Sequence, residues 1–255
     1  TTIPTLLKRF RQSVLAAAVS GKLTEEWRGR SFTTNVDESL NRILEARNKA
    51  IEGKNQQSKA HLTQEEYPIP NEWKWVSLDS LTLKIVDGTH HTPTYLDDGV
   101  PFISVKDIRN GRIDFTNTKF ISHKEHLELS KRCFVEVGDL LITKSGTIGR
   151  TAIVSTEKSF SLFVSVALLK PASNLVNMHF IDIALRKWVN EIDVSSRVVG
   201  SAIKNLHLQD MRVLAIPFPS VEEQTEIVRR VEQLFAFADQ IEQQVKNAQS
   251  RVNNL

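Results

Sequence analysis

Residues 217–255 read PFPSVEEQTEIVRRVEQLFAFADQIEQQVKNAQSRVNNL, and this stretch decides how the rest of the chain can be arranged. Its apolar residues alternate spacings of four and three, which is a heptad repeat. Such a repeat keeps one seam facing a partner helix, whereas burial against a single domain surface needs no strict register. Ser220 can cap the helix, and Glu222 and Glu223 suit the positive end of its dipole. The stretch predicts a rod of about 50 Å at 1.5 Å per residue. Its seam consists of Ile227, Val231, Leu234, Ala238, Ile241 and Val245, and the same spacing continues through Ala248, Val252 and Leu255.

A second, shorter seam opens the chain. Residues 1–21 read TTIPTLLKRFRQSVLAAAVSG, with Pro4 typical of a first helical turn and Gly21 typical of a helix end. We expect this helix and the C-terminal one to form a coiled coil, within one molecule or between two. The alternative is that the C-terminal helix simply lies on its own domain. The N-terminal seam consists of Ile3, Leu7, Phe10, Val14 and Ala17.

The middle of the chain alternates short apolar runs with turn dipeptides. Asp87-Gly88, Asn110-Gly111 and Ser145-Gly146 separate runs such as LTLKIV, VPFISV and DLLIT, which is typical of strands joined by tight turns. SLFVSVALL at 161–169 predicts one further strand, residues 178–192 show helical spacing, and residues 213–217 return to an extended run. The fold class is therefore α+β: one mixed, mainly antiparallel domain flanked by long coiled-coil-forming helices. We divide the chain into a helical region and linker at 1–61, the mixed domain at 62–217 and the distal long helix at 218–255.

The composition narrows the functional classes. A single cysteine excludes an internal disulfide and a cysteine-rich zinc site. No apolar run approaches the ~20 residues needed to cross a bilayer, so we expect a cytoplasmic protein without a membrane partner. The net charge of +3 permits an anionic partner without requiring one.

The usual catalytic motifs are absent from the sequence. We find no G-x-x-x-x-G-K-[ST], G-x-G-x-x-G, H-E-x-x-H or G-x-S-x-G. The pair His90-His91 has no second His/Cys cluster, so we predict no metal site. The chain is expected not to be an enzyme.

Four loops of the middle domain instead offer small, polar and basic side chains of the kind that reach phosphates and base edges. They span residues 87–99, 106–112, 143–150 and 195–205. Taken alone, each loop is better explained as an ordinary solvated turn. Four such loops on one domain without a catalytic motif favour DNA binding without chemistry. The alternative for the whole chain is a coiled-coil protein-interaction scaffold that has no DNA specificity. Our candidate DNA-binding residues are His90, His91, Lys106, Lys144, Ser145, Thr147, Arg150, Ser201 and Lys204.

The order of these parts resembles the specificity (S) subunit of type I restriction-modification enzymes. The resemblance rests on LKRFRQSVLAAAVSGKLTEEW at 7–27, GVPFISVKDIRNGRID at 99–114, GDLLITKSGTIG at 138–149 and IPFPSVEEQTEIVRRVEQLF at 216–235. It implies the C-terminal half of such a subunit, with one target-recognition domain. Whether the chain is a fragment or a natural half-size subunit stays open.

The resemblance also implies a role. The chain would be a non-catalytic DNA-recognition subunit that reads one half of a bipartite double-stranded DNA target and docks methylation (M) subunits. A restriction/motor (R) subunit would join through the complex. S-adenosylmethionine would bind the methylation subunit and no cofactor would bind this chain. The helices would act as a spacer between recognition domains, since 50 Å of rod corresponds to about 15 base pairs. A homodimer through the helices is a further possibility.

Overall fold

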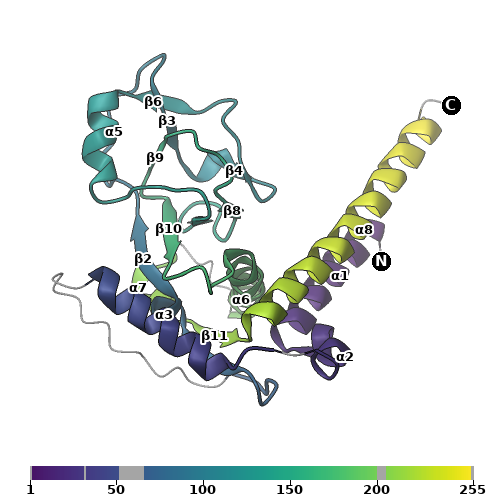
Figure 1. Cartoon of the computed structure of the whole chain (residues 1–255). Helices are drawn as coiled ribbons and strands as arrows, with labels where there is room; N and C mark the ends of the chain where they lie inside the picture. Colours follow the sequence, from purple (N-terminus) through teal and green to yellow (C-terminus); the bar gives the residue numbers. More distant parts are fainter. Residues whose placement is uncertain (1, 32, 52–65, 200–204, 254–255) are drawn as a thin grey trace.

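The computed structural model describes residues 2–31, 33–51, 66–199 and 205–253. Figure 1 shows a mixed region of sheets and short helices from which one long helix extends, with the N-terminal helix alongside its first part. The long helix is α8 (Val221–Asn253), whose 33 residues make a rod of about 50 Å. The N-terminal helix is α1 (Ile3–Val19). Both of the helices predicted at the ends of the chain are therefore present.

Helices α1 and α8 pack against each other within one chain, and they run antiparallel. The guanidinium of Arg11 lies 2.6 Å from the carboxylate of Asp239 and 3.2 Å from that of Glu242. At the other end of α1, the backbone carbonyl of Leu23 accepts a hydrogen bond from Arg230, nearer the start of α8. The structure thus contains the expected pairing of the terminal helices in its intramolecular form.

The buried stripe of α1 differs from the predicted seam. Ile3 remains 45% exposed and Ala17 is half-buried, whereas Leu15, Ala18 and Val19 are buried. The reason is that α1 packs against α6 (Met178–Val199) as well as against α8. A helix with two helical neighbours buries a wider face than a two-stranded seam does. The predicted seam residues that are buried are Leu7, Val14, Ile227, Val231 and Ala238, while Phe10, Leu234, Ile241 and Val245 are half-buried.

A buried carboxylate fixes the start of α8. The hydroxyl of Ser220 accepts a hydrogen bond from the backbone N–H of Glu223, as expected of a helix cap. The side chain of Glu223 in turn accepts hydrogen bonds from Thr24 (2.7 Å), Arg28 (3.0 Å) and the indole N–H of Trp73 (2.9 Å). Two distant segments of the chain, residues 24–28 and the stretch that contains Trp73, therefore converge on one residue of the rod.

Among the described residues, the middle of the chain forms four small sheets, and the predicted mixed, mainly antiparallel α+β class is confirmed. The pair β3–β9 is parallel, and every other strand pair is antiparallel. The largest sheet has the order β2 (Thr82–Asp87), β10 (Val166–Pro171), β7 (Leu140–Thr143), β8 (Thr151–Ile153). The second has the order β6 (Lys119–Ile121), β3 (Val100–Ile103), β9 (Ser161–Leu162). The two remaining pairs are β1 (Lys74–Ser77) with β11 (Ala215–Phe218) and β4 (Ile108–Arg109) with β5 (Arg112–Ile113).

The four-stranded sheet is covered on both faces. Side chains of a strand alternate between faces, so Leu140 and Ile142 join a core shared with the helices while Leu141 joins a second core beneath β3. The first core contains Val14 of α1 and Ile227 of α8 beside the sheet residues. The long helices are thus packed into the mixed domain, and the three-part division of the chain stays a prediction.

Two local predictions were wrong. The run at 161–169 is divided between β9 and β10, because Ser165 lies in a turn that bonds to two other loops: its carbonyl accepts from the N–H of Lys144 and its hydroxyl from the N–H of Val105. Val213 ends a short helix, α7 (Leu208–Val213), and does not begin the extended run.

The remaining helices are short or lie at the periphery. Helix α5 was not predicted from the sequence. No helix within the described ranges is sufficiently long and apolar to span a membrane. These helices are α2 (Glu25–Arg28), α3 (Val36–Ile51), α4 (Leu78–Leu81) and α5 (His123–Ser130), with 3₁₀ turns at Lys22–Thr24 and Val105–Asp107.

Candidate nucleic-acid interface

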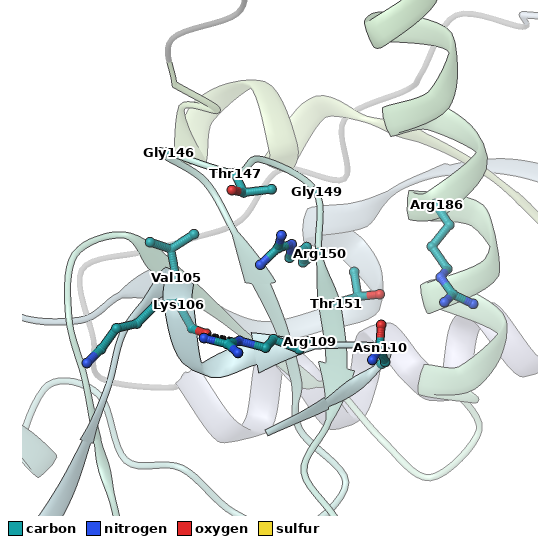
Figure 2. Close-up of a pocket in the computed structure, with 11 residues that line it drawn as sticks. Val105, Lys106, Arg109, Asn110, Gly146, Thr147, Gly149, Arg150, Thr151 and Arg186 are labelled. Atoms are coloured by element: carbon teal, nitrogen blue, oxygen red, sulfur yellow. Dashed lines mark hydrogen bonds between the residues drawn. The ribbon is translucent and has the colours of Figure 1, made fainter. Parts of the chain in front are cut away.

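A groove of about 800 Å³ lies where the β4–β5 hairpin, the loop at 144–150 and helix α6 meet. Four cationic side chains line it, and none of the described residues that line it is acidic. Figure 2 shows Lys106 at one side of the groove and Arg186, from α6, at the other, with Arg150 and Arg109 between them. The arrangement concentrates positive charge in one depression of a chain whose net charge is only +3.

The loop at 144–150 is held in shape by one threonine. The hydroxyl of Thr143 donates to the carbonyl of Thr147 (2.6 Å) and accepts from the N–H of Arg150 (2.9 Å). Gly146 and Gly149 have φ of +75° and +81°, a conformation that glycine adopts without strain. A Cβ at Gly149 would lie 2.2 Å from Val189 on α6, so the loop sits directly against that helix. The groove wall that carries Thr147 and Arg150 is therefore preorganised.

A second turn presents Lys106. The backbone N–H and hydroxyl of Ser104 both donate to the carboxylate of Asp107 at 2.8 Å, which closes a capping box around the 3₁₀ turn. Asp107 is buried, whereas the Lys106 side chain is about half exposed. Arg109 then donates from Nε to the carbonyl of Lys106 at 2.7 Å, the dashed line in Figure 2. Local hydrogen bonds thus orient two of the four cations.

The fourth cation, Arg186, comes from a helix that the sequence marked only as amphipathic. Its guanidinium lies 5.8 Å from the ring centroid of Phe235 on α8 and 3.8 Å from the carboxylate of Asp182. Burial raises the pKa of Asp182, because the charged form is poorly solvated there. Arg109, Asn110 and Arg186 were absent from our candidate list. The signal that could have found Arg109 was the cluster of three cations in KDIRNGR, but nothing in the sequence placed Arg186 beside it.

His90 and His91 lie at a different recess, beside Arg132. The Nε2 of His90 is 3.2 Å from the carboxylate of Asp87, and the Nδ1 of His91 is 2.7 Å from the hydroxyl of Thr89. Both imidazoles are largely exposed. The described residues contain no group of three or more His, Cys, Asp or Glu side chains that could hold a metal ion. The two histidines are therefore placed for surface contacts, apart from the four-cation groove.

Lys144 does not reach the surface as we had expected. Its side chain is only 8% exposed, and its Nζ lies 3.2 Å from the carboxylate of Asp87. Burial alone would raise the pKa of Asp87, but hydrogen bonds from Arg132, Lys144 and His90 outweigh burial and lower it. Because a charge in this position is neutralised inside the fold, we correct the assignment of Lys144 from a DNA contact to an internal ion pair that joins β2 to the loop after β7.

The other candidate DNA-binding residues fall into three groups by their place in the structure. The structure brings Lys106, Thr147 and Arg150 together around the groove. Ser145 is half-buried and forms a backbone bridge with Asn205. Ser201 and Lys204 lie outside the described residues.

Comparison with known proteins gives a consistent picture. Residues 70–249 match the family model described as "Type I restriction modification DNA specificity domain". The chain is 36% identical over 256 residues to the EcoBI specificity subunit of Escherichia coli, and 31% identical over 264 residues to the EcoKI specificity subunit of Escherichia coli strain K12. Each match covers 99% of this chain and 48% of the relative, so the chain spans about half the length of these curated relatives.

Two solved structures share the fold. One, from a study of complex assembly and conformational transition of the type I R-M system, has a TM-score of 0.59 at 17% identity and covers 97% of this chain and 56% of that one. The other, the HsdS subunit of Thermoanaerobacter tengcongensis, has a TM-score of 0.52 at 16% identity and covers 94% of this chain and 50% of that one.

Proposed function

Since the chain belongs to the family of type I restriction modification DNA specificity domains, we propose that it recognises one half of a bipartite double-stranded DNA target within a type I restriction-modification complex. The four-cation groove is the observation that carries the proposal. Lysine and arginine that neutralise DNA phosphates release condensed counterions, and this supplies much of the affinity of DNA-binding proteins. A preorganised basic groove suits such a polyanion.

The chain acts in this proposal by binding alone. Methylation subunits, which carry S-adenosylmethionine, dock on it and modify the DNA that it selects, and a restriction/motor subunit joins through the same complex. This division of labour agrees with the relatives that are named specificity subunits. The assembly works on DNA in the cytoplasm.

The long helices set the distance between recognition domains. Beyond the ion pair of Arg11 with Glu242, α8 continues for about three further turns to Asn253. Val245 on this part is only half-buried, as is Ile241 directly before Glu242. In the assembly, we assign this length of seam to another helix, supplied by the other half of a full-length subunit or by a second copy of the chain.

The experiment measures binding of the full chain to double-stranded DNA by fluorescence anisotropy at several salt concentrations. Several phosphate contacts make log affinity fall steeply with log salt, with a slope of about −0.9 for each contact. Lys106→Gln and Arg150→Gln should each reduce the magnitude of that slope by about 0.9. Lys49→Gln, an exposed lysine on α3 that does not line the groove, is the matched control and should leave the slope unchanged.

Selection from a random DNA pool completes the test. The expected result is one preferred half-site, bound at least ~10³-fold more tightly than unrelated DNA. A flat salt dependence together with no preferred sequence would overturn the proposal. That result would favour the competing hypothesis of a coiled-coil interaction scaffold.

A further inference from the structure

The β4–β5 hairpin has an anchored base and an exposed tip. Ile108 pairs with Ile113 across the strands, and Ile108 is fully buried in the core that contains β8 residues. The two turn residues, Asn110 and Gly111, have φ of +50° and +73° and are exposed. A two-residue turn with both φ positive matches the twist of a hairpin. The tip is therefore a rigid projection mounted on the sheet.

The tip gathers positive charge that the fold offsets only in part: the carboxylate of Asp114, just after β5, interacts electrostatically with Arg109. Arg109 and Arg112 are direct cross-strand partners, and like charges in that relation destabilise a hairpin. In the part of the chain that the structure describes, neither arginine forms an ion pair with a carboxylate. Arg109 is nevertheless held in place by its hydrogen bond to Lys106. An anionic partner outside the chain would relieve this repulsion.

Asn110 stands between these arginines and lines the same groove as Lys106 and Arg150. Figure 2 shows its side chain beside Thr151 and Arg186, at the edge of the groove. A two-stranded ribbon fits the major groove of B-DNA, where the amide of asparagine can accept a hydrogen bond from N6 of adenine and donate one to N7. The cations around it are placed for the flanking phosphates.

We propose that the hairpin tip at 109–112 enters the major groove and that Asn110 is a specificity-determining residue, which reads one adenine. This inference rests on the proposed function and deepens it. The turn itself does not require asparagine, because glycine adopts positive φ at least as readily. The side chain can therefore be removed while the turn is kept, and this makes the two roles separable.

The test compares the full chain with Asn110→Gly by selection from a random DNA pool and by salt-dependent anisotropy. We expect Asn110→Gly to lose the preference for A·T at one position of the half-site, where it was about 5- to 150-fold. The other positions should keep their preferences, and the salt slope should not change, because no charge is removed. Asn71→Gly, in an exposed turn outside the groove, is the matched control and should leave every preference unchanged.

Each other outcome has a definite meaning. If Asn110→Gly retains all preferences, the inference is overturned while the proposed function stands. If it loses preference at a G·C position, or at every position with an unchanged thermal melting curve, Asn110 is not the reader of one adenine. If the unsubstituted chain selects no sequence, the proposed function fails and this inference fails with it.

Discussion

Replacing Gly149 by alanine tests whether the loop at 144–150 is held against α6 by a close contact. Gly149 has φ of +81°, and an added Cβ would lie 2.2 Å from Cγ1 and 2.9 Å from Cγ2 of Val189. Two costs follow. A left-handed backbone at a non-glycine residue costs about 1–2 kcal/mol, and an extra methyl in a packed site costs about 1–3 kcal/mol. We therefore expect Gly149→Ala to lower the free energy of unfolding by about 2–5 kcal/mol.

Gly138→Ala is the matched control. Gly138 has φ of +91°, yet a Cβ there would meet no atom within 4 Å. This variant should show the backbone cost alone, about 1–2 kcal/mol. The difference between the two variants isolates the contact with α6.

The assay is urea denaturation at pH 7, extrapolated linearly to zero denaturant, with the slope m compared among variants. Adding Val189→Ala to Gly149→Ala removes both clashing methyl groups. The double variant should then be less destabilised than the sum of the two single variants by about 1–3 kcal/mol. The reasoning is refuted if Gly149→Ala costs no more than Gly138→Ala, or if the two substitutions at 149 and 189 are simply additive.

Three further predictions concern Glu223 at the start of α8 and two residues of α6 beside the groove, Asp182 and Arg186. Glu223→Ala should lower the free energy of unfolding by about 3–5 kcal/mol in chemical denaturation, because it leaves buried donors without their carboxylate. Glu232→Ala, at an exposed residue of the same helix, should cost less than about 1 kcal/mol. Asp182→Asn should stabilise the protein at pH 7, because the folded-state pKa of Asp182 is raised. The native protein therefore loses stability as pH rises from about 3.8 through that raised pKa. Denaturation at a series of pH values should show that the variant is more stable than the unsubstituted protein above this window and equally stable below it. Arg186→Gln should reduce the magnitude of the salt slope of DNA binding by about 0.9. Phe235→Leu, which removes only the ring beneath the guanidinium, should weaken binding while keeping the slope. An unchanged slope in Arg186→Gln would show that this residue does not contact DNA.

The elements of the fold were largely readable from local patterns. The start of α8 follows from a serine cap and two glutamates, and the hairpin at 108–113 follows from Asn110-Gly111. Both signals act within a few residues of the chain, so no knowledge of distant neighbours was needed. The division of 161–169 into two strands could not be read in this way, because Ser165 turns to meet two loops that lie far from it in sequence.

The candidate site was only partly readable. Polar loops between apolar runs pointed to Lys106, Thr147 and Arg150, and these residues do share one groove. Lys144, one residue after a buried strand, looked equally available, but Asp87 on the neighbouring part of the sheet holds its ammonium inside. A lysine that pairs with a distant carboxylate has the same local sequence signature as a solvated one.

By itself, the sequence determined the two long helices, the mixed α+β class, the tight turns and the family resemblance, because capping, heptad spacing and turn chemistry are properties of neighbouring residues. The tertiary structure alone decided which cations converge. It brought Arg186 of α6 to face Lys106 across the groove, gave α1 a second neighbour that widened its buried face, and closed the seam between α1 and α8 within one chain. The physical reason is that charge and apolar character are properties of single residues, whereas two residues distant in the sequence come close only when their segments pack into a common core.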